Sequence, residues 1–202
     1  MKIEKIEKYK GKTYGIYFKD AEPIFINSEI ISEYHLRAGT EIPESALAEV
    51  VRANDLRRAR ERAMYLLDAR EYSYIGLFKK LEANYDEDIC YEVLNRLCEL
   101  GLVNDRRYAE HLGEYYIITK GFGNYRASQE MYRKGISKEL INEVLERYQD
   151  DSTLRLYELV KAKYERYMED EKGIQKVRNA LIRKGFSYED INIVIRAVLE
   201  EE

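Results

Sequence analysis

The chain has few of the residue types on which catalysis and metal binding usually depend. Its 202 residues include two histidines, two cysteines, two prolines and no tryptophan. His35 and His111 lie in different regions, so histidine and cysteine form neither a metal cluster nor a nucleophile triad of recognisable spacing. The glycines of residues 120–124 follow a predicted helix and lack the Lys-Ser/Thr ending of a phosphate-binding loop. We therefore expect no enzyme, no metal and no cofactor.

Long apolar runs are also lacking. No run of about 18 apolar residues occurs, and residues 1–5 alternate in charge where a signal peptide would be apolar. Cys90 and Cys98 lie eight positions apart in one predicted helix, about 12 Å along its axis, which is too far for a disulfide. These features predict a cytoplasmic protein with reduced cysteines and no membrane contact. The net charge of −4, from 34 basic and 38 acidic residues, excludes a uniformly basic nucleic-acid coat.

The N-terminal residues differ in composition from the rest of the chain. Residues 2–9, 13–18 and 23–26 are rich in isoleucine, tyrosine and phenylalanine and predict three short strands of a β-meander. Ser28 is suited to cap a short helix, and a second helix is predicted from Pro43 to a position close to Asn54.

Beyond residue 55 the pattern is helical and it repeats. Residues 131–137 (MYRKGIS) return 50 positions later as residues 181–187 (LIRKGFS), and the apolar stripes that follow also agree. A third copy precedes them, with Asn84 in the place of the glycine that needs a positive φ. Each copy therefore has a longer helix followed by two helices that a sharp turn joins. The predicted longer helices are residues 56–69, 105–118 and 152–168, and the predicted caps of the last helices are Asp86, Ser137 and Ser187.

These patterns predict a mainly α-helical protein. Tandem three-helix repeats are expected to form an elongated, curved array that follows a small N-terminal β-rich (α+β) domain, because stacked repeats extend in one direction. Such arrays offer long surfaces to large partners. The predicted boundaries are residues 1–55 for the N-terminal domain and residues 56–104, 105–149 and 150–202 for the three repeats.

Basic residues are distributed unevenly, and the first repeat helix carries the densest group. Residues 56–70 hold five basic and two acidic side chains. On a helical wheel the apolar positions share one face, which places Arg57 and Arg58 on the opposite face and Arg60 and Arg62 at its flanks. Together they could contact phosphates, but an ordinary solvated helix face interleaved with acidic residues is an equally good interpretation.

Further basic candidates lie in the second and third repeats. Arg133-Lys134 and Arg183-Lys184 precede the repeated glycine, where helix C-termini favour cations, so a structural role is sufficient for those four. We interpret Lys120-Gly121-Phe122-Gly123 as a helix stop and hinge, and Arg126 one turn later has no such structural explanation. The remaining candidates of the second repeat are Arg106, Arg107 and Lys120.

Four segments taken in order resemble the RecX family of bacterial recombination regulators. They are residues 58–67 (RARERAMYLL), 97–109 (LCELGLVNDRRYA), 120–123 (KGFG) and 133–136 (RKGI). The resemblance covers roughly residues 56–202, and the preceding small domain is similar to the extension of longer members. The chain departs from the family pattern at Asn124, where a proline is usual, at Asn104-Asp105, where an acidic pair is usual, and at Tyr108, where phenylalanine is usual.

The resemblance implies a non-enzymatic regulator. RecX-like proteins bind the RecA recombinase, particularly its filament on single-stranded DNA, and inhibit its ATPase, recombinase and coprotease activities, which modulates DNA repair and the SOS response. We expect a monomer that contacts the recombinase filament, and single-stranded DNA directly or through the filament. The residues expected at the partner or DNA surface are Arg57, Arg58, Arg60, Arg62, Arg106, Arg107, Lys120 and Arg126.

A second hypothesis from the same residues is a tandem three-helix module that binds nucleic acid without a recombinase partner. It predicts tight, salt-sensitive binding to bare DNA, for which a net charge of −4 is unfavourable. Under the first hypothesis, capping of filament ends, insertion along the filament groove and sequestration of free subunits all need the same kinds of surface, so the three mechanisms stay open.

Overall fold

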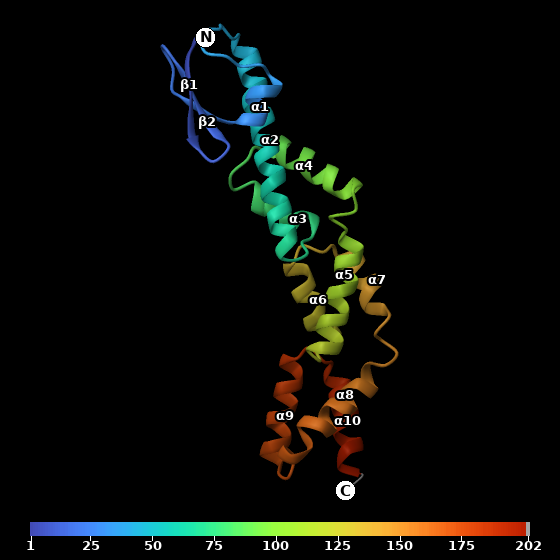
Figure 1. Ribbon diagram of the computed structural model, residues 1–202. Helices are drawn as coiled ribbons and strands as arrows, with labels where there is room; N and C mark the ends of the chain where they lie inside the picture. Colours follow the sequence, from blue (N-terminus) through green and yellow to red (C-terminus); the bar gives the residue numbers. More distant parts are fainter. Residues whose placement is uncertain (201–202) are drawn as a thin grey trace. The chain divides into compact units, whose positions relative to one another are not determined.

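The computed structural model describes residues 1–200 (Figure 1). These residues form two compact units. Unit 1 comprises residues 1–70 and 77–102, and unit 2 comprises residues 71–76 and 103 onward. Within the described residues no helix is both long enough and apolar enough to cross a membrane.

Unit 1 begins with a three-stranded antiparallel sheet of order β1-β2-β3, which confirms the predicted meander. Isoleucines that alternate along the strands turn one sheet face inward, and they pack with Ile30 and Val50 of the following helices into one buried cluster. The elements of unit 1 are β1 (Ile3–Lys10), β2 (Thr13–Phe18), β3 (Ile24–Asn27), α1 (Ser28–Glu33), α2 (Glu44–Ala69), α3 (Tyr74–Leu81, of which residues 74–76 belong to unit 2) and α4 (Glu87–Glu99).

Two sequence expectations for unit 1 are wrong. The cap of α1 is Asn27, whose side chain accepts from the Glu29 N–H, and Ser28 is already helical. The second predicted helix does not end near Asn54, because α2 continues without interruption into the first repeat. The Asn54 side chain is buried, accepts from the Asn27 N–H at 3.0 Å and donates to the Phe25 carbonyl, so the residue attaches α2 to β3. The polar side chain at the expected helix end therefore makes its hydrogen bonds with a strand that is distant in sequence, and the helix continues past it.

Unit 2 contains the second and third three-helix repeats, each around its own buried cluster. Met131 and Leu181 occupy the same place 50 residues apart, and both are fully buried. This agreement confirms the predicted repetition. The elements are α5 (Asp105–Glu114), a π-helical turn (Tyr115–Thr119), α6 (Asn124–Arg133), α7 (Lys138–Glu146), α8 (Ser152–Lys163), a 3-10 turn (Glu165–Tyr167), α9 (Glu171–Arg183) and α10 (Tyr188–Glu200).

The sharp turns between the last two helices of each repeat follow the prediction in two copies. Gly135 and Gly185 have φ values of 88° and 90°, and Ser137 and Ser187 each accept a backbone N–H of the next helix. In the first copy the prediction of a positive φ at Asn84 is wrong. Five residues separate α3 from α4, against four in the other copies, and the longer connection reverses the chain without a left-handed residue. Asp86 lies at the cap position of α4 but makes no capping hydrogen bond through its side chain.

Candidate binding surface

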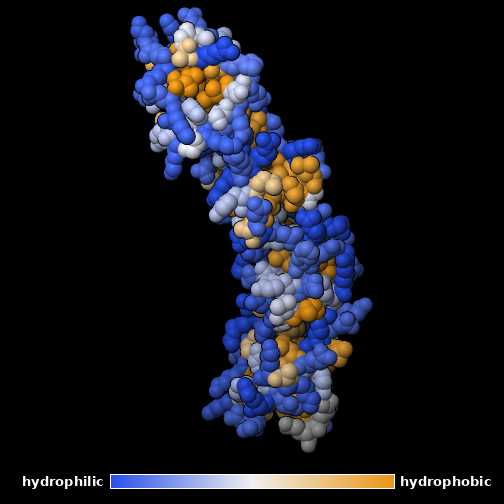
Figure 2. Space-filling model, in the orientation of Figure 1, coloured by the Kyte–Doolittle hydropathy of each residue, from blue (hydrophilic) through white to orange (hydrophobic). Residues whose placement is uncertain are grey.

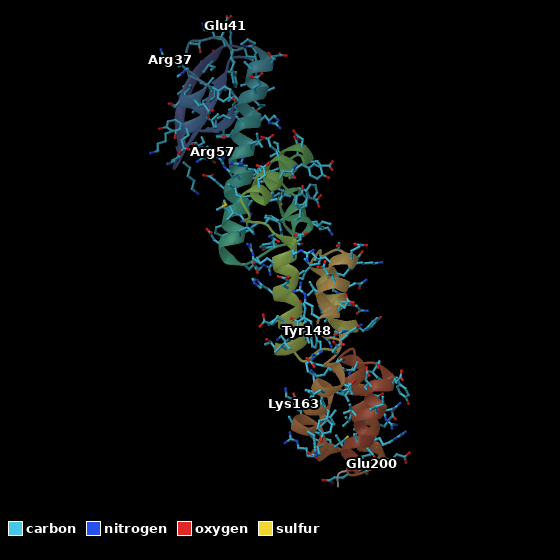
Figure 3. All side chains as sticks on the ribbon, turned by 90° about the vertical axis from the view of Figure 1, so that its right-hand side faces the viewer. Arg37, Glu41, Arg57, Tyr148, Lys163 and Glu200 are labelled. Carbon is cyan, nitrogen blue, oxygen red and sulfur yellow. The ribbon has the colours of Figure 1, made fainter. Side chains whose placement is uncertain are left out.

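The structure separates Arg57 from the other arginines of α2. Its side chain is only 13% exposed and lies between Glu29 of α1, at 3.1 Å, and Glu61, at 2.8 Å. Figure 3 labels Arg57 beside α2. Hydrogen bonds from Lys12 and Arg57 lower the pKa of Glu29. The expectation that Arg57 lies on a free face opposite the core is wrong, because α1 and β3 contact α2 on a second side that a helical wheel cannot represent.

The other arginines of α2 are exposed. Arg58 lies 3.7 Å from Asp55, Arg62 lies over the Tyr65 ring at 5.5 Å, and Arg60 faces solvent. Exposed ion pairs of this kind contribute little to stability, so these side chains can exchange one partner for another.

Arg106 and Arg107 begin α5 and are held by carboxylates of unit 2. Arg106 makes a two-pronged ion pair with Glu143, in which its hydrogen bond lowers the pKa of the carboxyl group. Arg107 Nε lies 3.1 Å from Glu71, which also contacts His111 Nδ1 at 2.7 Å. The two arginines point to different carboxylates, so the structure does not combine them into one cationic site.

A group of cations lies on and beside the half-buried ring of Phe122. The Arg126 guanidinium lies 4.3 Å from the ring centroid, and the Lys184 ammonium lies 5.5 Å from it. Lys163 is close enough to Lys184 to affect its titration, and Lys120 lies over the neighbouring Tyr115 ring at 5.2 Å. We call these five residues, Lys120, Phe122, Arg126, Lys163 and Lys184, the Phe122 cluster.

Local backbone features bring the cluster together. The π-helical turn ends at Thr119, Gly121 takes a φ of 59°, and the Phe122 N–H donates to the Tyr116 carbonyl. The Phe122 ring consequently stacks on the Tyr116 ring, with 7° between the planes. The helix stop predicted for this segment is confirmed.

The segment is then fixed to the α9–α10 turn of the third repeat. The Gly123 N–H donates to the Lys184 carbonyl at 2.8 Å, Arg126 Nη1 donates to the Arg183 carbonyl, and Lys184 Nζ donates to the Lys120 carbonyl. Two of these bonds are donated by the second repeat and one by the third. The segment predicted to be a hinge is therefore a docking point between the two repeats.

The Phe122 cluster has the electrostatics of an anion site. Burial lowers the pKa of Lys184, and the nearby charges of Lys163 and Arg126 lower it further. Against the four cations, Glu130 places a carboxylate 3.9 Å from Arg126 Nε. A bound phosphate would relieve the repulsion between the cations, and the exposed Tyr115 and Tyr125 rings nearby in sequence offer faces for base stacking.

Lys184 is expected to make the stability of unit 2 rise with pH in the alkaline range. Its pKa is lowered in the folded state, so between that value and its ordinary pKa the unfolded chain binds more protons than the folded chain. The free energy of unfolding therefore rises with pH across this window. Lys184→Met removes the titration. Chemical denaturation at a series of pH values should show the wild type gaining stability relative to the variant as pH rises, and a pH-independent difference would contradict the assignment.

Sequence reasoning identified part of this cluster. Lys120 and Arg126 were predicted and the structure places both in it, whereas Lys163 was not predicted and Lys184 was given only a helix-terminal role. Lys163 ends a helix of the third repeat, and no motif marks it. The repeated Arg-Lys-Gly turn is the one signal that could have led to Lys184, since it marks the point where the repeats dock.

Repeated helix triplets, docked through glycine turns and bearing a cationic aromatic surface, define a tandem three-helix-repeat protein. Residues 104–145 match the family model described as RecX, second three-helix domain, and residues 150–195 match RecX, third three-helix domain. The chain belongs to the RecX family of regulatory proteins.

Individual relatives agree along nearly the whole chain. A protein named Regulatory protein RecX from Clostridioides difficile (strain 630) is 32% identical over 98% of this chain and 95% of its own length. A protein of the same name from Streptococcus sanguinis (strain SK36) is 29% identical over 93% of this chain and 73% of its own.

Solved structures extend the agreement to the fold. A crystal structure of regulatory protein RecX superposes with a TM-score of 0.68 and 25% identity, covering 96% of this chain and 98% of the other. RecX from Lactobacillus salivarius gives a TM-score of 0.66 and 26% identity over 72% of this chain and 97% of its own. The predicted family and the three-helix-repeat fold class are therefore confirmed.

Proposed function

We propose that this protein binds a RecA recombinase filament on single-stranded DNA and inhibits the ATPase, recombinase and coprotease activities of the recombinase. The Phe122 cluster carries the proposal. Two cations over an aromatic ring, with two further lysines nearby, suit the alternating phosphates and bases of a single strand, which proteins contact through charge and stacking together. Family membership supports a regulatory role, because the relatives carry the name Regulatory protein RecX. The recombinase as the partner is what the resemblance to that family implies.

The charge distribution supports a filament over bare DNA as the target. The cluster is basic, but the chain as a whole carries a charge of −4, which lowers affinity for DNA at a distance. A mixed surface is suited to a partner that presents both protein and nucleic acid, since complementary patches select the partner and orient it. The exposed arginines of α2 and the N-terminal end of α5 are the further surfaces that we assign to the recombinase.

The test is the single-stranded-DNA-dependent ATPase activity of the cognate recombinase, measured with increasing amounts of this protein. We expect inhibition, together with only weak, salt-sensitive binding to bare DNA. Inhibition far below one protein per recombinase subunit would favour capping of filament ends, and inhibition only near saturation would favour binding along the groove. Unchanged ATPase activity with tight binding to bare DNA would contradict the proposal and favour the nucleic-acid-binding module instead.

A further inference from the structure

Unit 1 contains an apolar groove that the proposed DNA contact does not use. Helices α2 and α4 form its walls and α1 closes one end, with a volume of about 890 Å³. Several apolar side chains in it are exposed, including Tyr65 at 67% and Leu100 at 54%. Figure 2 shows hydrophobic side chains gathered at the surface where α4 ends. Met64 and Leu102 extend the same surface.

Opposite charges connect α2 with α4 beside the groove, since Arg52 of α2 pairs with Glu92 of α4 at 2.6 Å. Arg60 of α2 and Arg96 of α4 also line the groove, but they have the same sign and cannot pair with each other. Arg96 pairs instead with Glu99 of its own helix.

The shape of the groove fits a helix. Residues that line it on α2 recur every three or four positions from Ala53 to Asp68, which is the spacing of a single helix face. That stretch is about 22 Å long at the rise of an α-helix, enough for a partner helix of about 15 residues. Helix-in-groove recognition uses an apolar stripe as the anchor and flanking charges for selection.

The charges along the groove determine which charges we expect beside the apolar stripe of the partner helix. Arg57 is already paired with Glu29 and Glu61, and Glu92 is paired with Arg52. The charged lining residues outside these ion pairs and the Arg96 pair are Glu33, Arg60 and Asp68. They follow the groove in the order acidic, basic, acidic. The helix α1, which carries Glu33, contacts α2 through the Glu29–Arg57 ion pair, one turn before Arg60, and Asp68 lies two turns beyond Arg60.

We infer that this groove binds an amphipathic helix of a protein partner, with an apolar stripe and side chains that are basic near both ends and acidic in the middle. The required order reads the same in both directions, so either helix orientation satisfies it. The inference rests on unit 1 alone and does not depend on the DNA contact that we assign to the Phe122 cluster.

Two synthetic helical peptides of about 15 residues test the inference at the length that the groove accommodates. Both carry the same leucine stripe and one tryptophan; one has lysine near both ends and glutamate in the middle, and the other has these charges inverted. Because the protein contains no tryptophan, peptide emission reports binding to the full-length chain directly. We expect the first peptide to bind at least about tenfold more tightly than the second, because the inverted charges would place like charges next to each other in the complex.

Variants of the full chain assign the binding to the groove. Leu100→Glu and Tyr65→Glu are expected to weaken binding of the first peptide at least about tenfold, because a carboxylate enters the apolar stripe. Leu154→Glu is the matched control, since Leu154 is 58% exposed but lies on α8 outside the groove, and it should bind as the wild type does. Circular dichroism of each variant establishes that it is folded.

Several outcomes would overturn the inference. They are equal affinity for the two peptides, no binding of the first peptide, or an equal loss with Leu154→Glu. Sedimentation of the wild type and Leu100→Glu tests a different occupant: a dimer that this substitution dissociates would make a second copy of the chain the partner, and the inference of a foreign helix would fail. If the protein did not inhibit the recombinase ATPase but still bound the first peptide more tightly than the second, only the proposed function would be contradicted.

Discussion

Gly185→Ala is expected to lower the free energy of unfolding by about 3 kcal/mol or more, a large part of the stability of a domain this size. Gly185 is buried and has a φ of 90°, where an alanine side chain is strained. An added Cβ would also lie 2.4 Å from the Arg126 backbone nitrogen. The obstructing atoms belong to the first turn of α6, which cannot retreat without breaking the bond between Gly123 and Lys184.

A matched glycine separates the two causes of this loss. Gly39 has a φ of 85°, but an added Cβ there would meet nothing within 4 Å. Gly39→Ala should therefore cost only the backbone strain, about 1–2 kcal/mol. Urea denaturation followed by circular dichroism measures both variants. If they lose the same stability, the close packing of the repeat junction contributes nothing, and the docking role assigned to the Gly123–Gly185 contact is wrong.

Lys120→Glu/Lys163→Glu is expected to reduce inhibition of the recombinase ATPase by at least about tenfold, because the double reversal changes the local charge by four in a site that depends on phosphate attraction. These two lysines are the exposed members of the Phe122 cluster. Arg126 and Lys184 are left in place, since both donate hydrogen bonds that connect the repeats. The inhibitor concentration that halves ATPase activity is the measured quantity.

The control for this variant makes the same charge change elsewhere in unit 2. Lys172 and Lys176 are exposed on α9, and neither takes part in the Phe122 cluster. Lys172→Glu/Lys176→Glu should inhibit nearly as well as the wild type. Equal losses in the two double variants would mean that the total charge of the protein matters and the cluster does not. Thermal unfolding of both variants identifies any loss that follows from misfolding.

Residues close together in the chain account for the features that the sequence predicted well. The 50-residue repeat, the strands of the meander and the glycine turns at Gly135 and Gly185 each depend on a pattern within a few helical turns. Helical periodicity and a positive-φ glycine are local requirements of the backbone, so a single sequence is enough to show them. The family resemblance rests on the same local motifs.

The errors arise where a residue meets a partner far away in the sequence. Asn54 suggested the end of a helix, but Asn27 and Phe25 of the sheet satisfy its side chain. Arg57 was placed on a free face, but Glu29 of α1 pairs with it. A helical wheel describes one helix in isolation and contains no information about which other element covers its second side.

The sequence by itself determined the repeat, the helix-rich fold and the family of this protein, because all three follow from short-range periodicity and motifs. Only the tertiary structure decided which cations act together. Lys163 and Lys184 join Lys120 and Arg126 because two backbone turns dock through Gly123 and Gly185. Electrostatic interactions depend on the distance between charges in space. Where two repeats dock, the separation of two residues along the chain does not indicate that distance.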